Sequence, residues 1–268
     1  MPDGSALSPR QAQLLSLVRA RGFAPLEALA AELGVSAQTI RREVTRLTDL
    51  RLLQRFHGGA GLPSEDAVRP GWGEKQAAQA GAKARIGEAA TAEVPVGASV
   101  FLDVGTTVEA AAAALARRGG PLRVVTASLR SALALAGVEG MEVIIPGGVL
   151  RGADGSLAGG VTLAGLAPLR VDVALLACSG FDPADGAPMD WDPEKIAVKR
   201  AMLAGARRAI LLADATKHAR PALMRVAPAA DFAALITDAP PTEALNAALD
   251  AAGVAVTIAE PAARQALS

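Results

Sequence analysis

A short segment near the amino terminus, residues 33–43, constrains the fold of this chain more than any other. It reads Leu-Gly-Val-Ser-Ala-Gln-Thr-Ile-Arg-Arg-Glu. Gly34 suits the left-handed end of one helix, and Ser36 suits the N-cap of a second helix that begins directly after it. Two helices joined by so short a turn are typical of a helix-turn-helix unit. We therefore predict such a unit here.

The flanking sequence supplies the rest of a three-helix unit. Residues 8–11, Ser-Pro-Arg-Gln, combine an N-cap, a proline at the first helical position and a capping-box glutamine. This predicts a first helix that runs to about Arg21 and stops at Gly22. Pro25 is expected to open the second helix, because apolar residues then recur on one helical face at Leu26, Leu29, Ala30 and Leu33. The third helix has its apolar stripe at Ala37, Ile40, Val44 and Leu47.

The opposite face of the third helix carries side chains that suit the major groove of DNA. Glutamine can pair with adenine, arginine with guanine or phosphate, and threonine with phosphate or a thymine methyl. Residues 52–60 then predict a β-hairpin that turns at two glycines and could lie along the DNA backbone. The predicted DNA-binding residues are Ser36, Gln38, Thr39, Arg41, Arg42, Thr45, Arg46, Arg55 and His57. The alternative is a three-helix packing unit with a solvated polar face.

The distribution of charge favours the DNA-binding interpretation. The whole chain of 268 residues has a formal net charge of zero, so the net charge indicates no particular class of binding partner. Residues 1–60, however, hold eight basic and five acidic side chains, so this segment carries +3 and the remainder −3. The excess is modest, and a second copy of the chain would increase the affinity for DNA phosphates.

Cysteine usage and hydropathy indicate a cytoplasmic protein. The single cysteine, Cys178, lies in the apolar run 173–178, so we expect a packed core thiol and no internal disulfide. The polar, proline-containing start does not resemble a signal peptide. No stretch of about 20 residues is apolar throughout, so no membrane span is expected.

The rest of the sequence predicts a second domain of the α/β class. We assign residues 1–60 to the helix-turn-helix domain, 61–73 to a linker and 74–268 to the second domain, which opens with one helix over 74–93. Beyond it, helices expected at 107–117, 128–136, 161–166, 193–206 and 241–252 alternate with strands expected at 100–104, 122–126, 141–145, 171–178, 209–213, 234–237 and 254–258. Several strands are apolar throughout, as in a sheet covered on both faces. This pattern predicts a doubly wound, mostly parallel sheet.

Five consecutive strands end in small, hydroxyl or charged residues, which predicts a ligand site at the carboxyl edge of the sheet. Gly105, Thr106 and Thr107 open a helix, where backbone amides favour an anion such as phosphate. Lysines could add positive charge, and carboxylates could accept hydrogen bonds from sugar hydroxyls. The predicted effector-binding residues are Asp103, Gly105, Thr106, Thr107, Thr126, Ser128, Gly147, Gly148, Gly180, Lys199, Asp214 and Lys217.

Each of these residues also has a purely structural interpretation. Thr106 and Ser128 could only cap helices, and Gly147-Gly148 could be only a tight turn. Lys199 is the weakest member of the set, because a lysine on an amphipathic helix is usually solvated.

The sequence offers little for catalysis. Its two histidines are His57 and His218, and no Ser-His-Asp set, metal-ligand spacing or paired-carboxylate motif is present. Asp182, Asp185, Asp190 and Asp192 are expected in a loop over the pocket rather than as an acid–base pair. We therefore expect neither an enzyme nor a bound metal or cofactor.

Along nearly its whole length the chain resembles the DeoR family of bacterial transcriptional regulators. The resemblance rests on residues 33–36 and 39–42, His57-Gly58-Gly59-Ala60, Asp103-Val104-Gly105-Thr106-Thr107, Thr126 with Ser128, Gly147-Gly148, residues 198–202, Asp214 with Lys217, and Ile236-Thr237-Asp238. It implies a winged helix-turn-helix followed by a sensor domain similar to ribose-5-phosphate isomerase. It further implies a homo-oligomeric repressor of carbohydrate or polyol catabolic genes, released from operator DNA by a phosphorylated sugar or related metabolite.

The chain departs from the family pattern at several positions. Ala127 stands where asparagine is common, Ala215-Thr216 where Ser-Ser is common, and Lys75 near a usual arginine, so the effector is expected to differ or to bind more weakly. Residues 189–193 look like a feature of a subgroup. The alternative function is a sugar-phosphate isomerase-like enzyme with an appended helical domain, which would turn over ribose 5-phosphate. Activation instead of repression also stays open.

Overall fold

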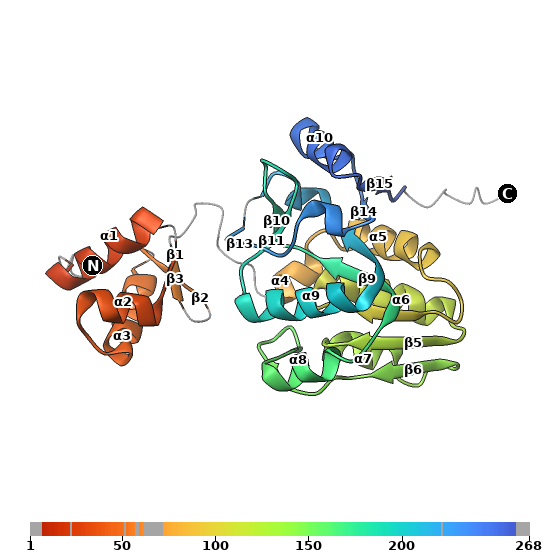
Figure 1. Ribbon diagram of the computed structural model, residues 1–268, viewed down its shortest axis with the longest axis horizontal. Coiled ribbons are helices and arrows are strands. Elements are labelled where there is room, and N and C mark those ends of the chain that lie inside the picture. Colours follow the sequence, from red (N-terminus) through yellow and green to blue (C-terminus); the bar gives the residue numbers. More distant parts are fainter. Residues whose placement is uncertain are drawn as a thin grey trace. The chain divides into compact units, whose positions relative to one another are not determined.

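The chain folds into two compact units, Met1–Pro70 and Gly71–Ser268. The computed structural model describes residues 7–21, 23–50, 52–56, 59–61, 72–220 and 222–260. Figure 1 shows the helical first unit in red and orange, and the larger second unit in yellow to blue.

Three helices form the first unit: α1 (Pro9–Arg21), α2 (Leu26–Leu33) and α3 (Ala37–Asp49). The capping box predicted at the start of α1 is present with both of its bonds. The Ser8 amide donates to Gln11 Oε1 at 3.0 Å, and the Gln11 amide donates to Ser8 Oγ at 3.2 Å. These bonds satisfy amides that the first helical turn leaves unpaired.

The turn between α2 and α3 has the predicted geometry. Gly34 adopts a left-handed conformation with φ of 66°, which a residue without Cβ enters at no steric cost. Ser36 caps α3, because its Oγ accepts the Thr39 amide at 3.2 Å. The predicted apolar stripe is buried at Ile40, Val44 and Leu47.

A small antiparallel sheet in the order β1-β3-β2 completes the unit. The hairpin of β2 (Gln54–Phe56) and β3 (Gly59–Gly61) confirms the predicted wing. Strand β1 (Phe23–Pro25) was not predicted, because Pro25 suggested only a helix start; it pairs along β3, and Pro25 also serves as the N-cap of α2. Gly61, which was predicted to open the linker, instead belongs to β3, where it pairs with Phe23 of β1 and Gln54 of β2.

The second unit is built on a seven-stranded sheet in the order β15-β14-β12-β9-β4-β5-β6, and every neighbouring pair is parallel. Its strands are β4 (Ser99–Leu102), β5 (Leu122–Thr126), β6 (Met141–Ile144), β9 (Val171–Ala177), β12 (Ala206–Leu212), β14 (Ala234–Thr237) and β15 (Ala255–Ile258). Each lies within three residues of the predicted range at either end, which confirms the doubly wound parallel fold.

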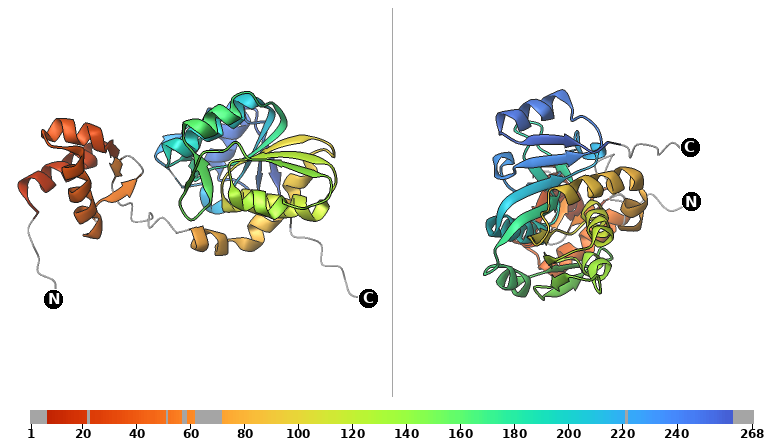
Figure 2. Two further views of the ribbon diagram at one scale, coloured as in Figure 1. Left: turned by 90° about the horizontal axis from the view of Figure 1, so that it is seen from below. Right: turned by 90° about the vertical axis from the view of Figure 1, so that its right-hand side faces the viewer.

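Helices cover both faces of this sheet (Figures 1 and 2). One apolar cluster includes side chains of α5 (Ala80–Ala92), α6 (Thr106–Arg118) and α7 (Leu129–Leu135). A second cluster includes side chains of α8 (Gly160–Leu166), α9 (Pro193–Gly205) and α10 (Glu243–Ala251). Burial on both sides explains why the central strands are apolar throughout.

Short elements that the sequence analysis missed surround the carboxyl edge of the sheet. Strands β7 (Val149–Arg151) and β8 (Ser156–Ala158) form a hairpin. Strands β10 (Gly180–Phe181), β11 (Pro188–Asp190) and β13 (Met224–Arg225) form an antiparallel sheet. Segments of two or three residues are too short for a hydrophobic period, so no pattern could have predicted them. Two 3₁₀ turns, η1 (Ala215–Lys217) and η2 (Ala229–Asp231), follow β12 and β13.

The single helix predicted over 74–93 is wrong. The chain forms α4 (Trp72–Ala77), then breaks, and resumes as α5. Gln79 lies at the break with φ of 55°, the only non-glycine residue with positive φ in the described ranges. The break leaves carbonyl oxygens at the end of α4 without intrahelical partners. Because α4 begins at Trp72, Trp72 and Gly73 lie in a helix rather than in the predicted linker.

Within the residues that the structure describes, no helix is both long and apolar enough to cross a membrane.

Candidate functional site

The predicted DNA-binding face of α3 is exposed to solvent. Gln38, Arg42, Thr45 and Arg46 all lie on the surface, opposite the buried stripe. Thr45 Oγ1 donates to the Arg41 carbonyl at 2.9 Å, which turns its hydroxyl back toward the helix. The exposed side chains therefore form a polar surface that can meet base edges in a major groove.

Three arginines of the first unit have no intramolecular partner among the described residues: Arg42, Arg46 and Arg55. Arg55 is exposed on β2 of the wing. By contrast, Arg10 forms an ion pair with Glu43, and its Nε donates to Glu43 Oε1 at 2.9 Å. Arg41, also predicted, lies 4.0 Å from Glu27 Oε1, and His57, another predicted contact, lies outside the described residues. Unpaired guanidinium groups on α3 and the wing are available for phosphate and guanine.

In the second unit, the predicted ligand site lies where the winding of the sheet reverses. The chain proceeds from β4 outward to β6, and then from β9 outward in the other direction to β15. Strands β4 and β9 are neighbours, so their carboxyl ends border the crevice in which doubly wound sheets bind ligands. Asp103 follows β4 directly, and its Oδ2 accepts the Ala177 amide at the end of β9, at 3.0 Å.

Lys199 is buried at this point, contrary to the expectation of a solvated lysine. Its side chain is 2% exposed and forms an ion pair with Asp103; its Nζ lies 3.5 Å from Asp190 Oδ2. It also donates to the Ala177 carbonyl at 2.8 Å. Helix α9 presents Lys199 toward the sheet, on the face that it shares with buried Ile196 and Met202, and the periodicity indicated this burial but not the carboxylates that it meets.

The charges of this buried group stabilise one another. Burial by itself would lower the pKa of Lys199, but Asp103 and Asp190 outweigh it and raise the pKa. Burial would likewise raise the pKa of Asp190, but Lys199 and hydrogen bonds from the Trp191 amide and the Ser179 hydroxyl lower it. Asp103 and Lys199 thus neutralise each other, which leaves them less able to bind a ligand than the sequence suggested.

The first turn of α6 remains available to an anion. Gly105 is the N-cap residue, and no side chain caps the helix. Thr106 is therefore not a cap: it is half-buried, with its Oγ1 3.5 Å from the Lys75 carbonyl oxygen. Thr107 is buried beside it. Uncapped amides and the positive end of the helix dipole favour a bound anion here.

Lys83 on α5 is a candidate site residue that the sequence analysis missed. It is 6% exposed. Its Nζ donates to the Lys75 carbonyl, which Thr106 also contacts, and to the Ala78 carbonyl at 2.7 Å. The sequence signal was present: Lys83 stands at i, i+3 and i+7 spacing with Ile86 and Ala90, which are buried.

The environment of Lys83 is also charged. Burial lowers the pKa of Lys83; the charge of Asp214 raises it, that of Lys217 lowers it, and that of Glu109 raises it. A bound phosphate would favour the charged form. Lys83 thus joins the predicted residues Thr106, Asp214 and Lys217 in one locality at the carboxyl edge of the sheet.

Lys217 lies in η1, after β12, and Asp214 directly precedes this turn. Asp214 is buried and caps this turn, accepting the Thr216 amide at 3.1 Å and the Thr216 hydroxyl. Lys217 is half-buried, and no carboxylate pairs with it in the described part of the chain. Its ammonium group can therefore serve a ligand.

Other predicted effector residues have structural roles. Thr126 is buried and donates to the Leu102 carbonyl at 2.7 Å. Ser128 caps α7 by accepting the Ser131 amide at 3.2 Å. Gly180 is buried in β10, where it pairs with Met189.

The two glycines after β6 serve the packing of α8. Gly147 and Gly148 adopt φ of 80° and 117°, and a Cβ on Gly148 would lie 1.9 Å from Thr162 Oγ1. That hydroxyl donates to the Gly147 carbonyl at 2.8 Å. Here the turn is required for close approach of the two segments.

The acidic stretch over 182–192, expected as a loop over the pocket, is a turn followed by strand β11, and its carboxylates have partners. Arg225 binds Asp182 and Asp185 at 2.6 Å and 2.5 Å. Asp192 caps α9 by accepting the Glu194 amide at 3.0 Å. Together with Asp190 beside Lys199, all four carboxylates have local partners, so the stretch tethers β10, β11 and β13.

Three further positions belong to the interior. Ala127, where the family often has asparagine, is fully buried in the apolar core. Cys178 is a free, buried thiol, and burial raises its pKa to about 12, which confirms the predicted core role. His218 is buried with Nε2 2.8 Å from Thr237 Oγ1, and burial lowers its pKa. In the described ranges, no three His, Cys, Asp or Glu side chains gather closely enough to hold a metal ion.

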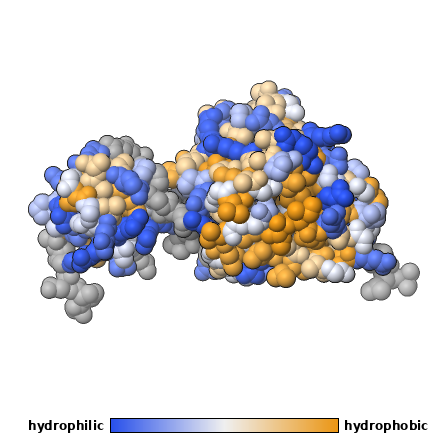
Figure 3. All heavy atoms as spheres, turned by 60° about the horizontal axis from the view of Figure 1, so that its bottom comes forward, coloured by the Kyte–Doolittle hydropathy of each residue, from blue (hydrophilic) through white to orange (hydrophobic). Residues whose placement is uncertain are grey.

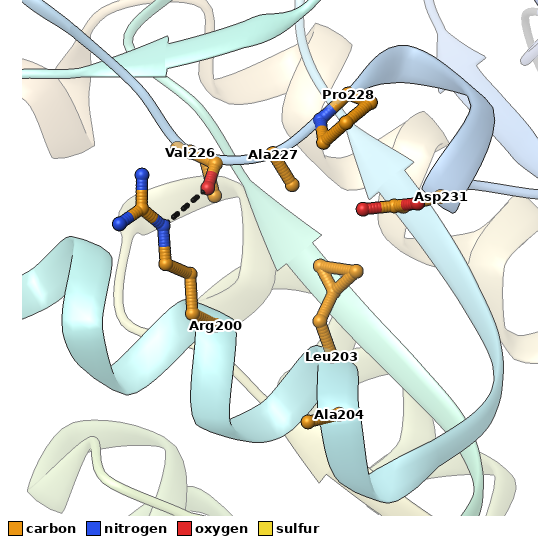
Figure 4. Close-up of a pocket in the computed structure, with 7 residues that line it drawn as sticks. All are labelled: Arg200, Leu203, Ala204, Val226, Ala227, Pro228 and Asp231. Atoms are coloured by element: carbon orange, nitrogen blue, oxygen red, sulfur yellow. Dashed lines mark hydrogen bonds between the residues drawn. The ribbon is translucent and has the colours of Figure 1, made fainter.

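A cavity of about 560 Å³ lies away from the predicted residues, between α9 and the segment around η2 (Figure 4). It is lined by Arg200, Leu203, Ala204, Val226, Ala227, Pro228 and Asp231. Arg200 donates to the carbonyls of Val226 and Arg225 at 2.7 Å and 2.9 Å, so its guanidinium already holds the chain together. The other charged residue of the lining is the acidic Asp231, which would repel a phosphate, so we place the candidate effector site at the strand ends.

Comparison with known proteins agrees with this two-part organisation. Residues 10–66 match the DeoR-like helix-turn-helix domain, and residues 78–239 match the DeoR C-terminal sensor domain. The chain belongs to the DeoR family. It is 36% identical to the glycerol-3-phosphate regulon repressor of Escherichia coli K12 over 228 residues, which are 85% of this chain and 89% of that protein. It is 37% identical to the HTH-type transcriptional repressor CsqR of the same strain, over 90% and 92% of the two chains.

This DeoR-family protein is therefore a DNA-binding transcriptional regulator, as the sequence predicted. The isomerase-like alternative is not favoured, because the relatives that match along the chain are named as transcriptional repressors. Among solved structures, ribose 5-phosphate isomerase A of Methanocaldococcus jannaschii is similar over 52% of this chain and 55% of that one, with 13% identity and a TM-score of 0.40.

Proposed function

We propose that this protein is a repressor of a carbohydrate or polyol catabolic operon, and that a small phosphorylated metabolite releases it from DNA. The single observation that carries the proposal is the uncapped start of α6 beside two lysines, Lys83 and Lys217, neither of which has a carboxylate ion-pair partner among the described residues. A dianionic phosphate supplies the charge and the acceptor oxygens that this arrangement lacks.

The proposed roles follow from the geometry. The α6 amides and the Thr106 hydroxyl would donate to phosphate oxygens, and the two lysines would balance their charge. Part of the Asp214 carboxylate is taken by Thr216, so it offers its remaining acceptor capacity to a ligand hydroxyl. The names of several relatives, glycerol-3-phosphate regulon repressor, make glycerol 3-phosphate the first compound to test.

The effector site predicts a ligand-dependent gain in stability. Glycerol 3-phosphate should raise the melting temperature, because a ligand that binds only the native state stabilises it. Glycerol and inorganic phosphate separately should have little effect. Lys217→Ala should abolish the rise and leave operator affinity unchanged, whereas Arg117→Ala, which removes one positive charge from a surface pair with Glu88, should behave like wild type.

The same proteins would then be titrated with effector on a duplex from their own promoter region in a gel-shift assay. Wild type should leave the duplex as effector is added, and Lys217→Ala should remain bound. If no sugar or polyol phosphate raises the melting temperature or releases DNA, the proposed effector site is wrong.

We also propose that the protein acts as a homo-oligomer. Each chain supplies one recognition helix, and operators read by helix-turn-helix proteins contain two half-sites. Five exposed apolar side chains gather around the edge strand β6, on α7, β7, α8 and the residue after β6: Leu133, Ile145, Val149, Leu150 and Val161. Figure 3 shows apolar surface on this side of the second unit. A second copy can cover the surface and pair its own β6 edge across a twofold axis.

Association through this surface predicts that a charge placed on it separates the copies. Val149→Asp, at a side chain 61% exposed, should convert the protein to the 27.0 kDa monomer in analytical ultracentrifugation and weaken operator binding. The matched control is Val96→Asp, at a side chain 71% exposed outside the surface, which should sediment like wild type. A wild-type protein that is already monomeric would contradict the proposal.

A protein that reads operator DNA acts where the genome lies, so the cytoplasmic location remains part of the proposal. Repression is preferred to activation because of the names of the relatives.

A further inference from the structure

Helix α4 is the first element of the second unit, and residues 62–71 join it to the wing. None of its side chains is buried. A six-residue helix without a buried face gains almost nothing from propensity or from apolar packing. Its position must therefore depend on the few polar contacts that it makes.

Several of those contacts involve residues of the proposed effector site and its rim. The Lys75 carbonyl accepts from Lys83 Nζ and lies 3.5 Å from Thr106 Oγ1, and the Ala78 carbonyl just beyond α4 accepts from Lys83 at 2.7 Å. Two of the groups proposed to bind phosphate, Lys83 and Thr106, thus also contact the end of α4.

At its other end, α4 is held by Trp72. The indole Nε1 donates to both carboxylate oxygens of Glu109 on α6, at 3.1 Å and 3.2 Å. The Arg130 guanidinium of α7 lies 3.3 Å from the centre of the indole ring. Arg130 in turn donates to the Ala153 carbonyl in the turn between β7 and β8 at 2.6 Å and 3.1 Å.

We propose that α4 is a strap that the effector releases: a phosphate that binds Lys83 and Thr106 replaces the carbonyls at its end and frees the helix. This inference rests on the proposed function and names its regulation. Lys83 and Thr106 have a limited number of donors, and a phosphate oxygen accepts more strongly than a peptide carbonyl. Because the linker continues directly from α4, release changes the point at which the linker leaves the sensor. The effector then shifts the population of the two states through its preference for the released one.

The break at Gln79 fits this interpretation. A non-glycine residue with φ of 55° is an unfavourable conformation, and such residues persist where surrounding contacts hold them. Here the contacts are the hydrogen bonds from Lys83. Their loss would remove the reason for the break and allow α4 and α5 to rearrange.

The first test needs no effector. Trp72→Ala removes the contacts with Glu109 and Arg130, so we expect at least tenfold weaker binding to the promoter duplex without effector. Trp72→Phe keeps a ring over Arg130 and should lie between this variant and wild type. Trp191→Ala, the change at the only other tryptophan, is the control and should bind DNA like wild type. Trp72→Ala protein that is folded by circular dichroism yet binds the promoter duplex like wild type would overturn the strap.

The second test follows α4 directly. A Trp191→Phe protein contains Trp72 as its only tryptophan, so its emission reports on the strap. Glycerol 3-phosphate should shift this emission to longer wavelength. The ligand concentration that gives half of the emission shift should equal the one that gives half of the thermal stabilisation. Thermal stabilisation without a change in Trp72 emission or in its quenching by acrylamide contradicts the strap and leaves the proposed function intact. Failure of wild type to bind the promoter duplex contradicts both.

Discussion

Lys199→Met is expected to lower the free energy of unfolding by about 3–5 kcal/mol, the cost of leaving one partner of a buried ion pair uncompensated. For a unit of this size that corresponds to a fall in melting temperature of roughly 6–20 °C. The reason is that Asp103, 2% exposed, would lose the one counter-ion that it has among the described residues, and Asp190, 13% exposed, would lose its nearest one there. Thermal unfolding followed by circular dichroism measures the effect.

Two comparisons isolate the ion pair. Lys217→Met is the same chemical change at a half-buried lysine that pairs with no carboxylate in the described ranges, and should cost far less stability. The double variant Asp103→Asn with Lys199→Met removes both charges and keeps an acceptor for the Ala177 amide, so it should be more stable than Lys199→Met alone. Equal losses in the single and double variants would show that packing, and not charge, holds this site.

The difference between wild type and Lys199→Met should also depend on pH. The pKa of Asp190 is lowered in the folded protein from an ordinary value of 3.8. Its pairing therefore contributes stability that is complete above pH 3.8 and is lost as the pH falls through the lower folded value. In the variant the carboxylates are unpaired and become easier to bury once protonated, so the two proteins should approach each other in stability under acid conditions.

Arg42→Ala should produce the second large effect, on DNA binding. A bidentate contact between arginine and guanine contributes about 1–3 kcal/mol of discrimination at each half-site, so operator affinity should fall by roughly tenfold or more. Arg42 is exposed on α3 with no intramolecular partner among the described residues, and its removal should leave the fold unchanged. Fluorescence anisotropy with operator and scrambled duplexes measures both affinity and specificity.

Arg55→Ala should behave differently, because Arg55 lies on the wing. If it contacts a phosphate, its loss weakens operator and scrambled duplexes alike and reduces the slope of log K against log salt by about 1. Arg117→Ala in the sensor makes the same change in net charge and should alter neither property. Operator binding by Arg42→Ala that equals wild type would remove α3 from the role of base reader.

The DNA-binding unit was the most predictable part of the chain, because its signals are local. A capping box at Ser8, a glycine at 34 and a serine cap at 36 depend on neighbours within four residues, and each formed as expected. The seven parallel strands were predictable for a related reason: burial on both faces leaves a continuous apolar run. The order of the strands in the sheet, and hence the reversal of winding between β4 and β9, cannot be predicted from any single segment, because it depends on contacts between segments.

The candidate site was predicted in outline and changed in detail. The rule that ligands bind at strand ends led to Thr106, Asp214 and Lys217 from the sequence alone. It also admitted Thr126 and Ser128, whose hydroxyls satisfy backbone groups nearby. Both kinds of residue look the same in sequence, because a cap and a ligand contact use the same atoms.

By itself, then, the amino-acid sequence determined the helix-turn-helix unit, the parallel strands and the polar face of α3, since periodicity and capping act over a few residues, and it indicated the edge of the sheet where we propose that a ligand binds. Only the tertiary structure decided which charges are already neutralised and which are not. Lys199 and Lys83 are both lysines on helices, but the first faces two carboxylates and the second only carbonyl oxygens. Asp103 is 96 residues from Lys199 in the chain, whereas the carbonyls that Lys83 contacts are 5 and 8 residues away, so the difference depends on how the helices pack on the sheet.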